Sequence, residues 1–134
     1  MNDLYQEQIL DHYRNPRNKG YLERAEASYE DQNPLCGDVI RMDLAFDPPL
    51  SRDATPHDRR IKEVRFSGRG CAISQAAASM LTEMVAGRTV AEATALTKDD
   101  LLAELGITLS AMRLKCALLA LKAFKAALYG LGSL

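Results

Sequence analysis

The stretch IKEVRFSGRGCAISQAAASMLTEMV, residues 61–85, contains the change of pattern that decides the fold. Residues Ile61–Phe66 are predicted to form a strand, in which Val64 and Phe66 share one face of an extended chain. A Gly-Arg-Gly turn then ends the strand. Small and apolar residues recur at helical spacing over Cys71–Val85. This stretch therefore predicts a strand that leads directly into a helix.

A second strand is predicted on the N-terminal side of this stretch. Over Val39–Phe46, Ile40, Met42, Leu44 and Phe46 share one face, as a strand with one buried face requires. The proline-containing segment 47–60 is expected to be a long, turn-rich loop between two antiparallel strands. The polar stretch that precedes Pro34 is expected to be irregular.

Helices are predicted on both sides of the strands, and each carries a local start or stop signal. Strands followed by helices indicate an α+β domain, in which a small antiparallel β-sheet is packed on one face by helices. We expect residues 1–134 to form this one domain. The other predicted helices are Leu4–Tyr13, a short helix after the Thr-x-x-Glu capping box at Thr89, Lys98–Leu105 capped by Thr97, and the last helix from Ser110 to Tyr129.

Composition narrows the classes of protein to which the chain can belong. Hydrophobic residues make up 47% and charged residues 26% of 134 residues, as in a globular protein. With 17 basic and 18 acidic residues the net charge is -1, which argues against nucleic-acid binding. No apolar run approaches the roughly 20 residues of a membrane span, and Met1–Tyr5 does not begin a secretory signal. We therefore expect a cytoplasmic protein with neither membrane nor nucleic acid as a partner.

The first cysteine stands beside an aspartate. In Leu35-Cys36-Gly37-Asp38 a glycine separates the thiol from the carboxylate, so both side chains can turn toward one point. Thiolate sulfur and carboxylate oxygen are both zinc ligands. A polar turn with a half-buried thiol is the alternative interpretation.

The second and third cysteines are associated with predicted helices. Cys71 begins a helix, where unpaired amides and the helix dipole favour a thiolate, although a small apolar residue at such a junction is equally common. Cys116 shares a helical face with Met112, Leu119, Ala120 and Ala123, so a core thiol is its simplest interpretation. Lys115, next to it, can hold a negative group near that thiol.

The three cysteines are too far apart in sequence, at 36, 71 and 116, to form a zinc ribbon. If the fold brings them together, Cys36, Asp38, Cys71 and Cys116 supply three sulfurs and one oxygen. Four ligands of this kind suit a tetrahedral zinc ion, and three thiolates with an exchangeable fourth ligand also suit an iron–sulfur cluster.

The remaining ionisable residues carry weaker signals. His12 is expected to make a surface or tertiary hydrogen bond, and His57 is expected to be solvated. Basic residues accumulate in the last helix, where they either complement the helix dipole or form a docking surface for an acidic partner. They are Arg113, Lys115, Lys122 and Lys125.

Taken together, these residues resemble the IscU/SufU family of iron–sulfur cluster assembly proteins, which includes NifU N-terminal-like domains. Three cysteine motifs stand in the family's order with the family's aspartate, and the match covers almost the whole chain. The motifs that carry the resemblance are Asp11-His12-Tyr13-Arg14-Asn15-Pro16-Arg17-Asn18, Asn33-Pro34-Leu35-Cys36-Gly37-Asp38, Gly68-Arg69-Gly70-Cys71-Ala72-Ile73-Ser74 and Arg113-Leu114-Lys115-Cys116-Ala117.

This resemblance implies a compact α+β fold whose three cysteines meet at one exposed end. It also implies a pyridoxal-phosphate (PLP)-dependent cysteine desulfurase as sulfur donor, and apo iron–sulfur proteins or downstream assembly factors as recipients. In the SufU-type branch zinc is held by the three cysteines and the aspartate. By resemblance to this branch, Cys36 would accept sulfur as a persulfide, and the protein would act with the desulfurase rather than as a stand-alone enzyme.

The residue before the third cysteine separates the two branches of the family. IscU-type scaffolds have histidine there and assemble a transient [2Fe–2S] cluster, whereas Lys115 is similar to the SufU version and would have an auxiliary role. SufU-type proteins usually carry an insertion between their second and third cysteines, and the interval between Cys71 and Cys116 is too short to hold it. The scaffold function therefore remains the alternative, with a purely structural zinc domain as a third.

Overall fold

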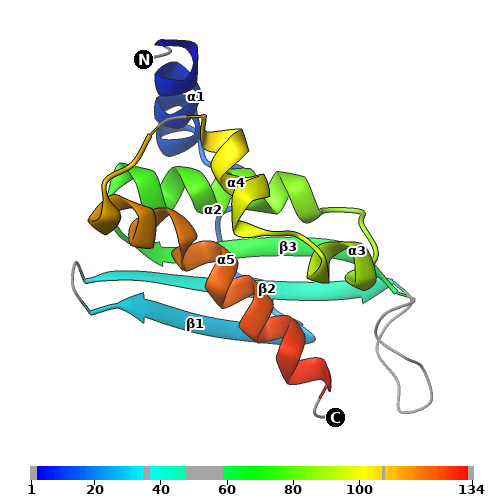
Figure 1. Ribbon diagram of the computed structural model, residues 1–134. Coiled ribbons are helices and arrows are strands. Elements are labelled where there is room, and N and C mark those ends of the chain that lie inside the picture. The colour runs from blue at the N-terminus through cyan, green and yellow to red at the C-terminus, as the bar shows by residue number, and fades with distance from the viewer. Residues whose placement is uncertain (1–2, 35–36, 48–58, 107, 133–134) are drawn as a thin grey trace.

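Three strands form one antiparallel sheet in the order β1-β2-β3 in the computed structural model, which describes residues 3–34, 37–47, 59–106 and 108–132 (Figure 1). The strands are β1 (Ala27–Asn33), β2 (Asp38–Asp47) and β3 (Arg60–Arg69). The antiparallel pairing of β2 with β3 confirms the expected α+β arrangement. Most of the segment expected to be a loop between them, including His57, lies outside the described residues.

Strand β1 corrects the expectation that the chain before Pro34 is irregular. Its sequence, ASYEDQN, is almost entirely polar, and only Ala27 and Asn33 at its two ends are buried. An edge strand is held mainly by backbone hydrogen bonds to one neighbour, here from Ala27 opposite Leu44 to Asn33 opposite Asp38. Such pairing does not require an apolar face, so the sequence pattern gave no sign of it.

Glycine at position 68 was expected to end β3, but the strand continues through it to Arg69. Gly68 lies opposite Ile40 with φ at +128°, a conformation that favours glycine. A side chain there would collide with the carbonyl oxygen of Val39 on the neighbouring strand. The glycine therefore permits close approach of β2 and β3 instead of breaking the sheet.

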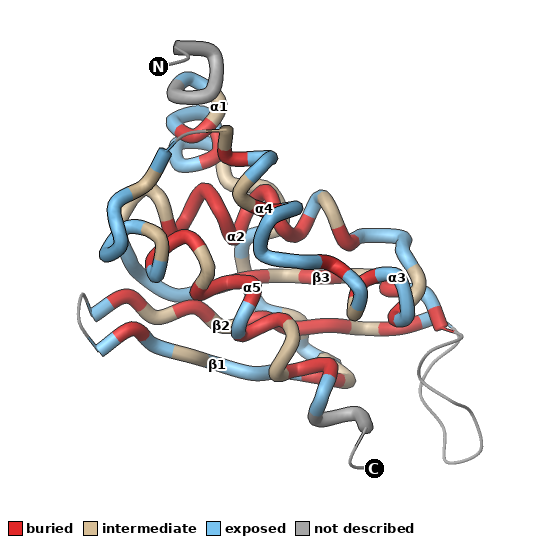
Figure 2. Tube along the Cα trace, in the orientation of Figure 1, coloured by how far each residue is buried: buried red, intermediate tan, exposed pale blue. Residues whose placement is uncertain are grey.

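The alternating pattern of β2 is confirmed by burial. Ile40, Met42 and Leu44 are 0% exposed and Phe46 is 1% exposed. They pack against Val64 and Phe66 of β3 and against helices that cover this face (Figure 2). One sheet face and its helices thus form the core.

The described part of the chain contains five helices, one before the strands and four after them. Helix α2 packs on β3, α5 crosses β1 and β2, and α1 packs on α2 (Figure 1). No helix among the described residues is long and apolar enough to cross a membrane. Their bounds are α1 (Asp3–Arg14), α2 (Ala72–Val85), α3 (Val90–Thr94), α4 (Lys98–Leu105) and α5 (Ala111–Gly132).

The predicted helix caps are present. Thr89 with Glu92, and Thr97 with Asp100, form reciprocal capping boxes at the starts of α3 and α4. The Ser110 hydroxyl accepts a hydrogen bond from the amide of Arg113 at the start of α5. Helix α5 runs beyond its expected end at Tyr129, to Gly132.

The connection between α1 and β1 is fixed to the sheet. Asn18 and Gly20 exchange backbone hydrogen bonds with Phe66, on the edge of β3 that β2 leaves open. Asp43, 1% exposed on the face opposite the core, accepts hydrogen bonds from the Leu22 amide and the Ser28 hydroxyl. A buried carboxylate thus attaches this connection to the middle strand.

Candidate metal centre

Three of the predicted site residues converge although they come from three separate elements. One ligand atom each from Asp38, Cys71 and Cys116 lies within 4.8 Å of the others. Asp38 begins β2, Cys71 precedes the first residue of α2, and Cys116 lies near the start of α5. Cys36, the fourth predicted ligand, lies outside the described residues. The fold therefore brings together one carboxylate and two thiols.

Asp38 is a buried carboxylate in an unusual setting. It is 5% exposed, and its Oδ2 atom has no hydrogen-bond partner among the described residues. Burial raises the pKa of Asp38, but hydrogen bonding from Ser74, from the Cys71 thiol and amide and from the Cys116 thiol outweighs burial, so the pKa is lowered. The site therefore favours an ionised carboxylate with one oxygen available to a further ligand.

Gly70 allows this carboxylate to reach the start of α2. A Cβ atom at position 70 would lie 2.8 Å from Cγ and 3.0 Å from Oδ2 of Asp38, and it would also collide with Ser74 Oγ. Real Cβ atoms do not approach other atoms so closely. The bare backbone of Gly70 is therefore part of the site.

Cys71 occupies the N-cap position of α2 without capping the helix through its side chain. The Ser74 hydroxyl lies 3.0 Å from the Cys71 carbonyl oxygen and 3.9 Å from Cys71 Sγ. No acidic residue stands in the first turn of α2, so the Asp38 carboxylate is the negative group that β2 brings to this positive helix end. The thiol is partly exposed and accessible from the end of the sheet.

Cys116 is buried in the core and also lies close to the other two candidate ligands. The side chain is 3% exposed beside buried Leu119, Ala120 and Ala123, as a core thiol would be. It also faces Asp38 and Cys71. Met112 was expected on the same buried face but is 59% exposed, because the first turn of α5 extends past the edge of the core.

The described residues fit a metal ion by their chemistry. Two sulfurs and a buried oxygen that no described residue hydrogen-bonds are suitable zinc ligands, and a tetrahedral ion needs one more ligand. Cys36 stands two positions before Asp38 in sequence. Lys115 is not part of this group; its side chain is exposed and lines a groove beside it.

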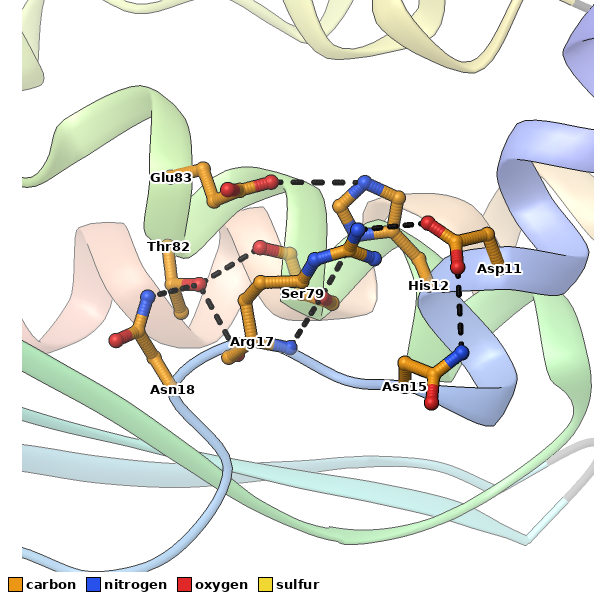
Figure 3. A network of polar contacts seen from close by, with 8 residues as sticks. All are labelled: Asp11, His12, Asn15, Arg17, Asn18, Ser79, Thr82 and Glu83. Atoms are coloured by element: carbon orange, nitrogen blue, oxygen red, sulfur yellow. Dashed lines mark hydrogen bonds and ion pairs between the residues drawn. The ribbon is translucent and has the colours of Figure 1, made fainter.

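A polar network joins α1 and the turn after it to α2 (Figure 3). It includes side chains of the motif from Asp11 to Asn18. His12, 5% exposed, contacts Ser79 Oγ through Nδ1 at 2.7 Å, which confirms its expected tertiary hydrogen bond. The Arg17 amide donates to the same Ser79 oxygen, and Asn18 donates to Thr82. These contacts fix α1 and the turn after it to α2, the helix that begins at Cys71.

Burial and the Arg17 charge lower the pKa of His12, although Glu83 and Asp11 act in the opposite direction. Glu83 Oε1 lies 3.5 Å from His12 Nε2, and the Arg17 guanidinium is paired with Asp11 at 2.6 Å. Because Ser79 Oγ accepts the Arg17 amide hydrogen bond, its hydroxyl donates a hydrogen bond to Nδ1 of the neutral imidazole, whose own proton lies on Nε2, toward Glu83.

Comparison with known proteins identifies relatives of this chain. The chain is 33% identical to the zinc-dependent sulfurtransferase SufU of Bacillus subtilis, over 93% of this chain and 89% of that protein. It is 32% identical to the iron–sulfur cluster assembly scaffold protein IscU of Streptococcus pyogenes, over 96% and 84% of the two chains. The resemblance to IscU and SufU proteins is thereby confirmed.

Solved structures and a family model extend the comparison. A crystal structure described as a putative iron–sulfur cluster assembly scaffold protein for the SUF system, from Fervidobacterium islandicum, matches with a TM-score of 0.72 and 28% identity. The match covers 91% of this chain and 94% of that one. The model of the NifU-like N-terminal domain matches residues 4–131. The chain therefore belongs to the NifU-like N-terminal domain family.

Proposed function

We propose that this protein serves iron–sulfur cluster assembly by accepting sulfur, as a persulfide, from a PLP-dependent cysteine desulfurase. The observation that carries the proposal is the convergence of Asp38, Cys71 and Cys116 around a carboxylate oxygen that lacks a hydrogen-bond partner among the described residues. Zinc would be held by these three residues and Cys36. The relative named a zinc-dependent sulfurtransferase supports this choice of metal.

Each residue has a defined part in this function. Zinc, when bound, keeps its thiol ligands deprotonated. Cys36 attacks the terminal sulfur of the donor persulfide, so that a new S–S bond forms at Cys36, the donor S–S bond breaks and the donor leaves as a thiolate. Asp38, Cys71 and Cys116 keep their places because they are fixed to the sheet, the α2 terminus and α5. Thiols that are not joined in disulfides persist in a reducing compartment, and we place the protein in the cytoplasm.

A second candidate function uses the same donor set. Two thiolates and a carboxylate from separate elements, with Cys36, would also hold the irons of a [2Fe–2S] cluster, which the protein would then pass to apo iron–sulfur proteins or downstream assembly factors. The relative named an IscU scaffold supports this alternative. The lysine at position 115 favours the first function, because the family resemblance implies lysine at this position in SufU-type proteins and histidine in IscU-type scaffolds.

The first test is metal and sulfide content with an absorption spectrum, on protein purified anaerobically without added metal. About one zinc per chain and no visible colour are expected for a single four-ligand site. A cysteine desulfurase should then turn over faster with the wild-type chain than with the Cys36→Ser variant. Iron and sulfide in equal amounts would instead establish the scaffold function, and zinc without stimulation of the desulfurase would contradict sulfur transfer.

A further inference from the structure

A groove lies beside the candidate metal centre, between the end of β1, the start of α4 and the middle of α5. Its volume is about 510 Å³, within the usual range for a binding pocket. The described residues that line it fall into three kinds. They are the leucines 118, 119 and 121, the lysines 98, 115, 122 and 125, and the strand end Gln32, Asn33 and Pro34.

The leucines form a recessed apolar surface. Leu119 is 4% and Leu121 5% exposed, whereas Leu118 is partly exposed. The aliphatic stems of the surrounding lysines extend this surface while their ammonium groups remain in water. An occupant therefore gains most by placing apolar side chains against the leucines and anionic groups near the rim.

The charge on the groove has one sign. The described residues that line it include four lysines and no acidic side chain, in a chain whose net charge is -1. Just outside this lining, the Asp31 carboxylate lies 3.9 Å from Lys122 Nζ, and the Lys122 side chain is 76% exposed. The lysine end of this pair is in water and the separation is long, so the pair is weak and Lys122 can exchange Asp31 for another anion.

Helix dipoles do not explain these lysines. Lys98 is the first residue of α4, and Lys115 stands in the second turn of α5. Cations near a helix N-terminus oppose the dipole instead of complementing it. The position of these two side chains therefore favours the second sequence interpretation, a docking surface for an acidic partner.

We propose that this lysine groove binds an acidic segment of a partner protein that carries apolar side chains between its carboxylates. Apolar side chains of the segment occupy the leucine surface, and its carboxylates pair with the lysine rim. A nucleic acid has no aliphatic groups for the leucines, and recessed leucines such as Leu119 do not insert into a lipid surface. The proposal depends on neither zinc nor sulfur transfer.

The groove also adjoins the candidate metal centre. Lys115 directly precedes Cys116, and Pro34 stands two positions before Cys36 in sequence. A segment bound here would thus hold its protein next to the thiols. This gives a partner a point of attachment that leaves the metal ligands themselves untouched.

The test uses the full chain and a fluorescently labelled peptide built from glutamate, leucine and alanine, with fluorescence anisotropy as the readout. A peptide with lysine in place of each glutamate serves as the reference ligand. We expect the acidic peptide alone to bind, with affinity that falls as salt screens the charges. Amide shifts in the NMR spectrum should cluster at Lys98 and along α5 between Lys115 and Lys125.

Variants distinguish binding at the groove from a non-specific effect of the protein's net charge. Reversing two rim charges together, in the double variant Lys122→Glu/Lys125→Glu, should weaken binding by about tenfold or more. Lys62→Glu, an exposed change on β3 outside the groove, should leave it within about twofold. Leu118→Gln should weaken binding without changing charge. Circular dichroism checks that each variant is folded.

Three results would overturn the proposal. One is equal affinity of the wild-type and charge-reversed chains for the acidic peptide, and another is equal weakening by Lys62→Glu. The third is tighter binding to single-stranded DNA or to phosphatidylserine vesicles than to the peptide, lost with the same charge reversal. In that case the groove would be a nucleic-acid or lipid site.

Discussion

The carboxylate of Asp38 lies so close to the backbone of Gly70 that a Cβ atom at position 70 would come within 2.8 Å of Asp38 Cγ. The contact joins the first residue of β2 to the turn that leads into α2, and it sets the distance between two candidate ligands, Asp38 and Cys71. Close packing of the backbone, rather than any property of the ligands, thus determines the geometry of the site.

Gly70→Ala is therefore expected to disturb the site more than the fold. The added methyl group pushes Asp38 and Ser74 away from the start of α2, and zinc affinity should fall by about tenfold or more, as when a metal ligand loses its support. Competition with a chromophoric chelator measures that affinity. Gly20→Ala is the control: open space surrounds Gly20, but its φ of +135° strains any side chain, so the variant should cost about 1–3 kcal/mol of stability and leave zinc affinity unchanged.

Asp38→Ala is expected to slow the release of bound metal or cluster to an acceptor. The carboxylate is the hard, exchangeable ligand in a set of soft thiolates, and the variant removes it while leaving the sulfurs in place. Stopped-flow transfer to a chelator or an apo-protein gives the rate. Asp47→Ala, at the exposed far end of the same strand, provides the control. Identical transfer rates in Asp38→Ala and wild type would argue against the role of Asp38.

His12 is expected to make folding stability depend on pH in the weakly acidic range. Its pKa in the folded protein is lowered from 6.5 by burial and Arg17, so below pH 6.5 the unfolded chain binds more protons than the folded one. The free energy of unfolding is therefore greatest above pH 6.5 and decreases as the pH falls from there toward the folded pKa. The described carboxyl groups whose pKa values are shifted, on Asp11, Asp38, Glu92 and Asp100, are all lowered and titrate at more acidic pH.

Urea titrations of metal-free protein between pH 5 and pH 8 measure this dependence, a range chosen to bracket the ordinary histidine pKa. His12→Asn can keep one hydrogen bond to Ser79 but does not titrate, so its stability curve should be flatter. A slope equal to that of the wild type would assign the pH dependence to another group.

Asp43→Ala is expected to destabilise the protein strongly although it lies away from the core face. The carboxylate is 1% exposed and accepts hydrogen bonds from the Ser28 hydroxyl at 2.7 Å and from Arg41 Nε at 2.9 Å. The Arg41 side chain is 41% exposed and can turn to water, so the loss of these hydrogen bonds should cost about 1–3 kcal/mol. Asp31→Ala, which removes the pair with Lys122 and a hydrogen bond from the Gln32 amide, should cost less, about 1 kcal/mol by urea unfolding. Similar losses in both variants would show that Asp43 does not fix the connection to the sheet.

Metal removal is expected to leave the fold in place. The candidate ligands lie at element ends, whereas the sheet, α2 and α5 share a continuous core that includes Leu44, Leu81 and Phe124. Addition of a strong chelator should therefore lower the melting temperature without loss of the helical circular-dichroism signal at 25 °C, an ordinary assay temperature. Complete unfolding on chelation would instead favour the structural zinc domain.

The sequence by itself determined those parts of the protein that depend on neighbouring residues. The alternation from Ile40 to Phe46 predicted the buried face of β2, because side chains of an extended chain point to opposite sides in turn. Thr89 and Thr97 predicted two helix starts, because a capping box involves only four consecutive residues. The cysteine motifs predicted the candidate ligands from their chemistry, including Cys36, whose place in the site remains a prediction.

Only the tertiary structure decided the rest. Strand β1 is polar and held by backbone hydrogen bonds to β2, which leave no periodic pattern in its side chains. The meeting of Asp38 with Cys71 and Cys116, and the closeness of Gly70, depend on where β2, α2 and α5 end relative to one another. The lysine groove likewise combines residues of α4 and α5 with the end of β1. Such arrangements are set by the packing of whole elements on the core, which no local stretch of sequence encodes.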